Sequence, residues 1–180
     1  MSLGEFVDAL GERAFGIILF AMALPVSIPF LYGVPQVMAL PMMALSMQML
    51  LGRGEPWLPA RFKASRLEKR GLTRMATGGS QWFGWLEALA RPRLTALSGP
   101  IAERMIGGVF VIFCTSILIP LPATNTTPGI ALAIAALGLL TRDGLLVIAG
   151  LVLGMVWIAL LLVFGHTVID VIRTYLQTVF

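Results

Sequence analysis

The chain has 180 residues, of which 58% are hydrophobic and 12% charged, and its mean hydropathy is +0.91. This composition would leave a water-soluble fold with too little polar surface, so it excludes an ordinary soluble domain. The formal net charge is +4, and a single cysteine, Cys114, excludes a disulfide framework and a cysteine pair for a metal. We therefore expect an all-α integral membrane protein.

The first unit, residues 1–51, is predicted to be a short amphipathic lead-in followed by a helical hairpin. Acidic residues outnumber Arg13 before the first apolar run, which is the reverse of a basic signal-peptide leader, so we expect this segment to be retained. The apolar block 14–51 is interrupted by four prolines and Gly33. It divides into the pieces 14–32 and 34–51, each about 27 Å long as a helix and barely able to cross a bilayer.

The second unit, residues 52–104, is predicted to be a basic loop on the cytoplasmic side. It holds ten Lys or Arg and four acids, a net charge of +6, and positive charge is enriched in cytoplasmic loops. Trp82 and Trp85 suggest an amphipathic helix lying in the membrane interface within 75–98. The basic residues are not interleaved with aromatic residues in the way that a nucleic-acid-binding groove would require, so nucleic-acid binding is not expected.

The third unit, residues 105–180, is predicted to contain a second hairpin, a closing helix and an amphipathic tail. The apolar pieces 105–119 and 129–141 flank a polar, proline-bounded loop. The second piece is only about 20 Å long as a helix, which favours a re-entrant or protein-packed segment. The run Gly144 to Gly165 carries no charge and is predicted to span the membrane.

The two hairpins align with each other. Glu12-Arg13 and Gly16 match Glu103-Arg104 and Gly107 at a separation of 91, and Leu50-Leu51 match Leu139-Leu140 after a two-residue slip. This pattern predicts a duplicated, proline-broken helical hairpin, an arrangement common in transporters. The alternative is a chance likeness between two apolar hairpins.

These elements also resemble a known family. The segment 51–59 (LGRGEPWLP), the two Glu-Arg pairs, and Asn125 to Pro128 followed by 138–144 (GLLTRDG) are similar to the ExoD family of bacterial membrane proteins. This chain has Gly54 and Glu55 where the family usually has arginines. The resemblance implies a role in exopolysaccharide synthesis at the inner membrane, with no established reaction, catalytic residue or cofactor.

Two groups of residues are candidates for function. Charges near the membrane are costly unless paired, and the polar loop could bind a ligand through side chains and freed backbone groups. The alternatives are ordinary topological anchors for the charges and an external turn for the loop. The candidates are Glu12, Arg13, Glu103, Arg104, Thr124, Asn125, Thr126, Arg142 and Asp143.

Enzymatic function is not expected. The sequence shows no pair of carboxylates suited to glycosyl transfer or hydrolysis and no metal-binding acidic motif, and His166 is the sole histidine. One hypothesis is an inner-membrane, multi-pass protein that moves a small solute, ion or lipid-linked saccharide in support of exopolysaccharide synthesis. The other is a non-transporting scaffold or regulator of the biosynthetic proteins. The lipid bilayer is the expected partner, and Gly150 with Gly154 predicts a homodimer through a GxxxG contact.

Overall fold

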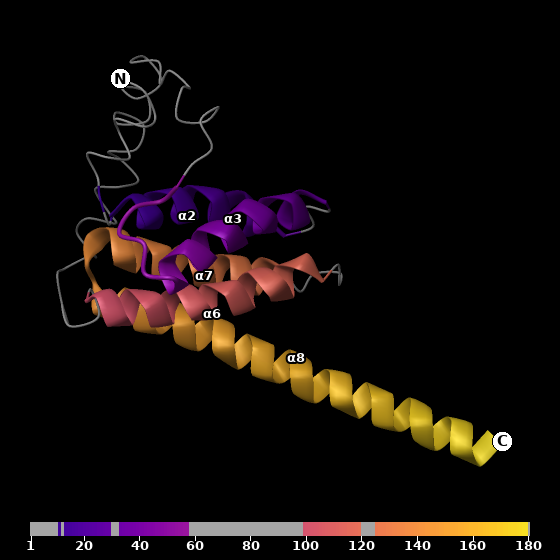
Figure 1. Cartoon of the computed structure of the whole chain (residues 1–180). Helices are drawn as coiled ribbons and strands as arrows, with labels where there is room; N and C mark the ends of the chain where they lie inside the picture. The colour runs from indigo at the N-terminus through magenta and orange to yellow at the C-terminus, as the bar shows by residue number, and fades with distance from the viewer. Residues whose placement is uncertain (1–10, 12, 30–32, 58–98, 120–124, 180) are drawn as a thin grey trace.

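The computed structural model describes residues 11, 13–29, 33–57, 99–119 and 125–179, and of 168–179 it describes only the helix. Within these residues every regular element is an α-helix, as predicted from composition and apolar runs. The helices are α2 (Arg13–Val26), α3 (Val34–Leu50), α6 (Pro100–Leu118), α7 (Thr126–Thr141) and α8 (Gly144–Val179), shown in Figure 1. The predicted interfacial helix in 75–98 lies outside the described residues.

Prolines mark where several helices begin. Gly33 precedes α3 and Gly99 precedes α6, and in both helices a proline occupies the first or second position. A proline is tolerated there because its missing N–H would have no partner inside the helix. The sequence prediction placed the break at Gly33 correctly. It began the second hairpin too late, because α6 begins at Pro100 and so includes the Glu-Arg pair.

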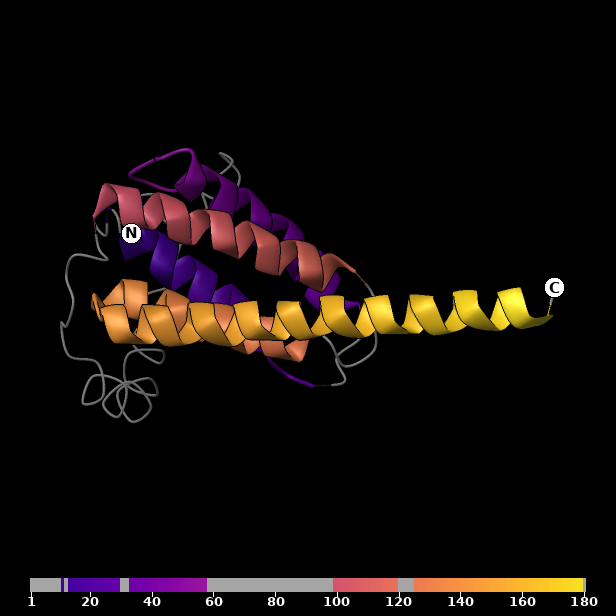
Figure 2. The ribbon, with the colours of Figure 1, turned by 90° about the horizontal axis from the view of Figure 1, so that it is seen from below.

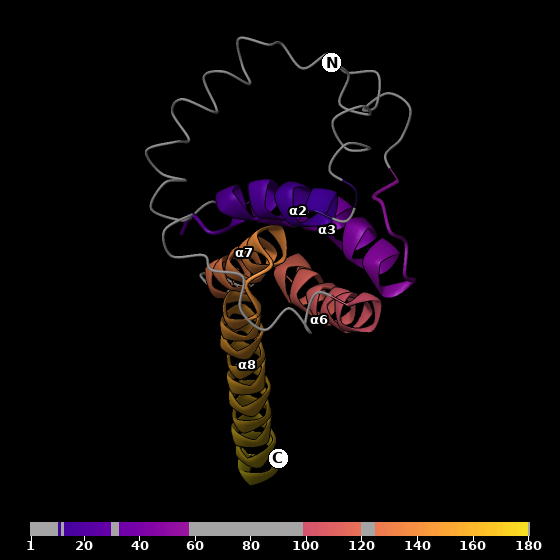
Figure 3. The ribbon, with the colours of Figure 1, turned by 90° about the vertical axis from the view of Figure 1, so that its left-hand side faces the viewer.

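The main contacts cross between the hairpins. α2 packs on α7 and α3 packs on α6, while α8 lies along α7 (Figures 1 and 3). α6 and α7 each contact three neighbouring helices, and the alanines and glycines of α7 are largely buried. Small residues let helix backbones approach closely, which matters in a membrane because lipid supplies no hydrophobic force between helices.

The ends of α2, α3, α6 and α7 lie together at two opposite ends of the bundle. Gly16, early in α2, lies against Leu140, late in α7, whereas Gly129 at the start of α7 lies against Val26 at the end of α2. α6 likewise starts beside the end of α3. We call the end with Arg13, Arg104 and Arg142 the basic end, and the opposite end, with Val26 and Thr126, the tip end. α8 begins at the basic end (Figure 1).

The outer faces of the bundle are apolar. On α3 the exposed side chains include Val37, Leu40 and Met47, and on α6 they include Ile101, Met105 and Ile112. Two helices, Pro100–Leu118 and Gly144–Thr167, are long and apolar enough to cross a membrane. Together with these exposed faces, they indicate membrane association.

α8 is much longer than its neighbours. It has 36 residues, about 54 Å, whereas the other helices have 14 to 19 residues. The segment predicted as a separate amphipathic tail continues the same helix to Val179. Its C-terminal part extends past the tip end of the bundle, as Figure 2 shows.

The GxxxG pair in α8 is used inside the chain. A Cβ on Gly150 would lie 2.5 Å from the Ala131 carbonyl oxygen of α7, and Gly154 lies against the Phe113 ring of α6. The predicted homodimer contact at these glycines is therefore wrong, because helices of the same chain already occupy their faces. A homodimer formed through another surface stays a prediction.

Candidate functional site

The candidate residues separate into two groups at opposite ends of the bundle. The basic end carries Arg13, Glu103, Arg104, Arg142 and Asp143, and the tip end carries Asn125 and Thr126. Glu12 and Thr124 lie outside the described residues. The structure therefore does not gather the candidates into one site, and each end has its own geometry.

At the basic end, α3 and α7 finish in the same way. Gly52 N–H donates to the Met49 carbonyl at 2.9 Å, and Arg53 N–H donates to Gln48 at 3.1 Å. In α7 the corresponding bonds run from Arg142 to Leu139 at 3.4 Å and from Asp143 to Gly138 at 2.9 Å. This Schellman pattern requires a left-handed residue, which is Gly52 at φ 76° and Arg142 at φ 54°.

Arg104 lies against the end of α3. A Cβ added to Gly52 would be 2.6 Å from the Arg104 Cζ atom, so the guanidinium occupies the space that the glycine leaves open. The carbonyl end of a helix carries a partial negative charge, which favours a cation there. This contact gives Arg104 a structural role in joining α6 to α3, a role that the sequence pattern did not reveal.

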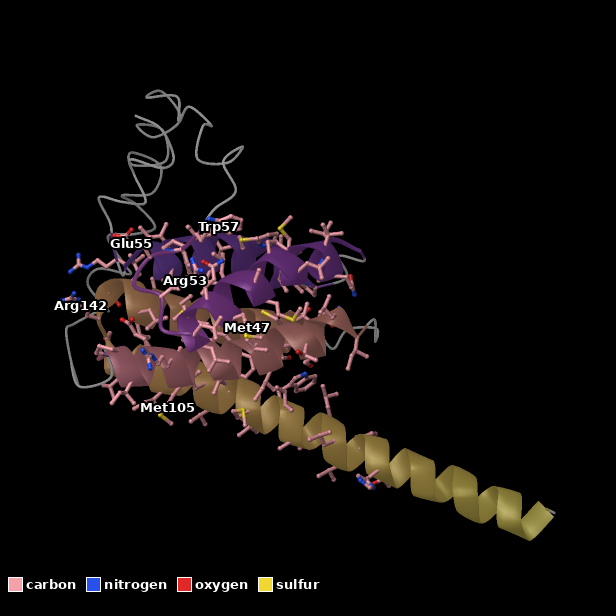
Figure 4. The ribbon with its side chains drawn as sticks, viewed as in Figure 1. Met47, Arg53, Glu55, Trp57, Met105 and Arg142 are labelled. Carbon is pink, nitrogen blue, oxygen red and sulfur yellow. The ribbon has the colours of Figure 1, made fainter. Side chains whose placement is uncertain are left out.

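Asp143 caps the long helix. Its side chain is 3% exposed, and its Oδ1 atom accepts a hydrogen bond from Leu145 N–H at 3.0 Å. A carboxylate at this position satisfies a free N–H group and complements the positive end of the helix dipole. Arg142, next to it, is exposed at the edge of the bundle (Figure 4).

The Glu-Arg pairs lie at helix starts. Arg13 is the first residue of α2 and is exposed, whereas Glu103 lies half-buried in the first turn of α6. An acidic residue in a first turn is favoured by the helix dipole. The described geometry thus accounts for Glu103 and Arg104 as helix-end residues.

Gln48 was not among the candidates predicted from the sequence. Its side-chain amide holds the backbone of Trp57 at both ends: Trp57 N–H donates to Oε1 at 2.6 Å, and Nε2 donates to the Trp57 carbonyl at 3.3 Å. These two hydrogen bonds hold the segment after α3, which includes the buried Pro56, against the helix. A glutamine in an otherwise apolar helix was the available signal.

The tip end carries polar atoms that have no partner. The Asn125 Oδ1 atom and the Gln36 Oε1 atom are both buried without a hydrogen bond among the described residues. Asn125 occupies the cap position before α7 but makes no capping bond, and Gln36 lies in the first turn of α3. Thr126 is half-buried beside Asn125. Gln36 was not among the sequence candidates.

Hydroxyl groups in the bundle, including that of Ser27 at the tip end, are satisfied locally. Ser27, Ser46, Thr115 and Thr141 each donate at 2.8 Å to the carbonyl four residues earlier. The two amide oxygens at the tip end differ because an oxygen without a hydrogen cannot donate to a backbone carbonyl. Within the described residues, His, Cys, Asp and Glu side chains form no group of three that could hold a metal ion.

Comparison with known proteins gives consistent matches. The model of the family described as "Exopolysaccharide synthesis, ExoD" matches residues 1–163, which confirms the resemblance drawn from the sequence elements. A Synechocystis protein of uncharacterised function is 28% identical over 100% of this chain and 89% of its own length. Protein ExoD of Rhizobium meliloti is 32% identical over 83% of this chain and 64% of its own length. No solved structure matches.

Proposed function

Because the chain belongs to the ExoD family of exopolysaccharide synthesis, we propose that it is a multi-pass inner-membrane protein that supports this synthesis by transport. The transported species would be a small solute, an ion or a lipid-linked saccharide. Non-transporting scaffolding of the biosynthetic proteins is the alternative that the experiment below must separate from transport.

The first support is a pattern of contacts that fits the predicted duplication of the hairpin. Gly16 faces Ala136 and Leu140, and Gly107 faces Ser46 and Leu50 in the same manner, so the facing positions differ by 90. The two Schellman ends are also 90 apart. This register replaces the separation of 89 suggested by the leucine pairs. The hairpins start at the same end, so the repeat would be parallel, as in transporters whose halves are related by an axis along the membrane normal.

The second support is the charge at one end. Arg13, Arg53, Arg104 and Arg142 lie at four helix junctions at the end where α2, α6 and α8 begin, and the sequence that joins α3 to α6 carries most of the +6 charge of residues 52–104. The positive-inside rule then puts this end on the cytoplasmic side. α6 and α8 are long enough to cross the membrane, and the shorter α2, α3 and α7 would run beside them within it, which gives the several passes.

The observation that carries the transport proposal is the pair of buried, unpartnered amide oxygens on Gln36 and Asn125. A scaffold gains nothing from buried polar atoms that lack a hydrogen-bond partner, each of which costs about 1–3 kcal/mol. A transporter needs such groups, because they compensate for the water that a polar substrate loses.

The test is a flux measurement with purified protein in liposomes. We expect wild-type protein to release a trapped polar solute or ion, or to move a polar lipid between leaflets, faster than protein-free vesicles. Replacing Gln36 and Asn125 together by leucine should abolish the flux and reduce exopolysaccharide output in a complementation assay. Normal output from a protein without any flux would overturn transport and leave the scaffold.

A further inference from the structure

We propose that Arg53 and Trp57, held in place by Gln48, form a docking surface for the headgroups of anionic phospholipids in the cytoplasmic leaflet. This surface would set the depth of the basic end of the bundle in the membrane. The inference rests on the membrane placement in the proposed function and not on transport. It depends on the hydrogen bonds of the segment 51–57, on the exposure of its side chains and on its level along α3.

The segment 51–57 turns back along α3. Trp57 N–H donates to the Gln48 Oε1 atom at 2.6 Å, and the Gln48 Nε2 atom donates to the Trp57 carbonyl at 3.3 Å. Arg53 N–H donates to the backbone carbonyl of Gln48 at 3.1 Å. Pro56, which precedes Trp57, is buried. One glutamine therefore ties the backbone of both Arg53 and Trp57 to the last turn of α3.

These hydrogen bonds suit a segment that lies at the edge of the hydrocarbon. In water, solvent would serve the polar backbone groups almost as well, so bonds to a side chain would add little. Near the hydrocarbon, water is scarce and the protein must supply the partners itself. The Gln48 amide does so for both polar groups of the Trp57 backbone, and Pro56 has no N–H that needs a partner.

The level of Trp57 along the bundle agrees with this depth. Its backbone is bonded to Gln48, which lies four residues before Gly52, and Arg104 lies against Gly52. Four helical residues correspond to about 6 Å, so Trp57 lies about that far inside the end of α3. The interfacial layer on each side of a bilayer is about 5–8 Å thick. When Arg104 lies among the phosphates, the indole ring is therefore at the boundary between headgroups and acyl chains.

The exposed side chains of the segment fit an anionic lipid surface. Trp57 is 59% exposed and Leu51 is 70% exposed, and Arg53 is also exposed. Tryptophan is enriched at membrane interfaces because its ring is apolar and its indole N–H can donate to a headgroup oxygen. The guanidinium of Arg53 matches a phosphate in charge and geometry. Figure 4 shows Trp57 on the side of the bundle away from α8, and it shows Glu55 nearer the basic end, toward water.

The experiment uses the fluorescence of Trp57 in liposomes that contain the full chain. Trp57 becomes the single tryptophan when Trp82, Trp85 and Trp157 are replaced by phenylalanine. Phospholipids brominated in the upper or the lower part of an acyl chain quench at different depths, and iodide quenches from water. We expect strong quenching by the upper bromine, weaker quenching by the lower bromine and little quenching by iodide.

A second measurement tests the charge of the lipid. Brominated phosphatidylglycerol and brominated phosphatidylcholine are compared at the same mole fraction in a phosphatidylcholine bilayer. One arginine near the surface favours an anionic lipid by about fivefold, so phosphatidylglycerol should be enriched around Trp57 by up to that factor. Arg53→Gln should remove the enrichment. Arg142→Gln, which removes the same charge at the end of α7, should retain it.

Gln48→Met tests the two hydrogen bonds that hold Trp57. Methionine keeps the length of the side chain but cannot bond to the backbone, so quenching by iodide should rise and quenching by the upper bromine should fall. Gln36→Met, which replaces the other glutamine of α3 near its start, should leave both unchanged. Circular dichroism and a single elution peak in detergent confirm that each variant is folded.

The outcomes separate this inference from the proposed function. Strong quenching by iodide with weak quenching by bromine would overturn the docking surface, because Trp57 would then face water. Weak quenching by every reagent would also overturn it, since protein would then cover the ring. Equal quenching by the two brominated headgroups would refute the role of Arg53. If the protein floats with the liposomes in these cases, the membrane placement stands, whereas protein that does not float with them would contradict both proposals.

Discussion

Gly107 and Gly108 are adjacent in α6 but meet different surroundings, so they form a matched pair for testing the packing of α6 on α3. A Cβ at Gly107 would lie 2.7 Å from the Leu50 nitrogen and 2.9 Å from the Ser46 carbonyl oxygen. These are backbone atoms and cannot rotate away. A Cβ at Gly108 would meet only a methyl group of Leu50 at 3.4 Å.

The expected effects have opposite signs. Replacing glycine by alanine inside a helix gains about 0.5–1 kcal/mol from backbone entropy. At position 108 this gain should appear as added stability. At position 107 the overpacking costs about 1–3 kcal/mol, which exceeds the gain and separates the two helices. Gly107→Ala should therefore lower the free energy of unfolding, and Gly108→Ala should raise it slightly.

The buried thiol provides the assay. Cys114 is 0% exposed in the native bundle, so a thiol-reactive fluorophore labels it only when the bundle opens. Thermal or SDS titration of each variant in mild detergent then gives a transition midpoint. If Gly107→Ala and Gly108→Ala shift the midpoint equally, the close contact between α6 and α3 is wrong.

Three further predictions use the basic end. Gly52→Ala should cost about 1–2 kcal/mol, since it forces a left-handed alanine against Arg104, and adding Arg104→Ala should recover part of that loss in a double-mutant cycle. Asp143→Ala should cost about 0.5–2 kcal/mol through loss of the α8 cap, whereas Asp143→Ser should cost less, both measured by the same thiol assay. A cysteine at Ser65, with the native cysteine removed, should resist a membrane-impermeant thiol reagent in intact cells, and labelling from outside would reverse the topology.

Several features could be read from the sequence because they depend on local chemistry. Long charge-free runs predict helices in lipid, and Gly33 with the neighbouring Pro35 predicts the break between α2 and α3. The start of α6 was misplaced because Glu103 and Arg104 looked like the end of a loop. In the structure they fit a first turn, where an acidic residue is favoured and the arginine reaches Gly52.

The candidate site was less accessible. The polar loop was identified, but Gln36 was not, because a glutamine in a mostly apolar stretch is usually a packing residue whose hydrogen bonds are satisfied. Only the three-dimensional arrangement shows that its oxygen is buried without a partner and lies at the same end as Asn125. Gln48 was missed for the same reason, although its bonds to Trp57 give it a structural role.

By itself, the sequence determined the helical class, the two-hairpin order and the family, since apolar length, proline position and short motifs are properties of the chain. Only the tertiary structure decided which helices pair. The apolar faces of α3, α7 and α8 carry almost no charge, so nothing local distinguishes a lipid-facing side from a helix-facing one. Close packing at small residues decides it, as Gly150 and Gly154 illustrate: the sequence predicted that they pack tightly, and in the fold they pack on the α7 backbone and on the Phe113 ring of α6 in the same chain.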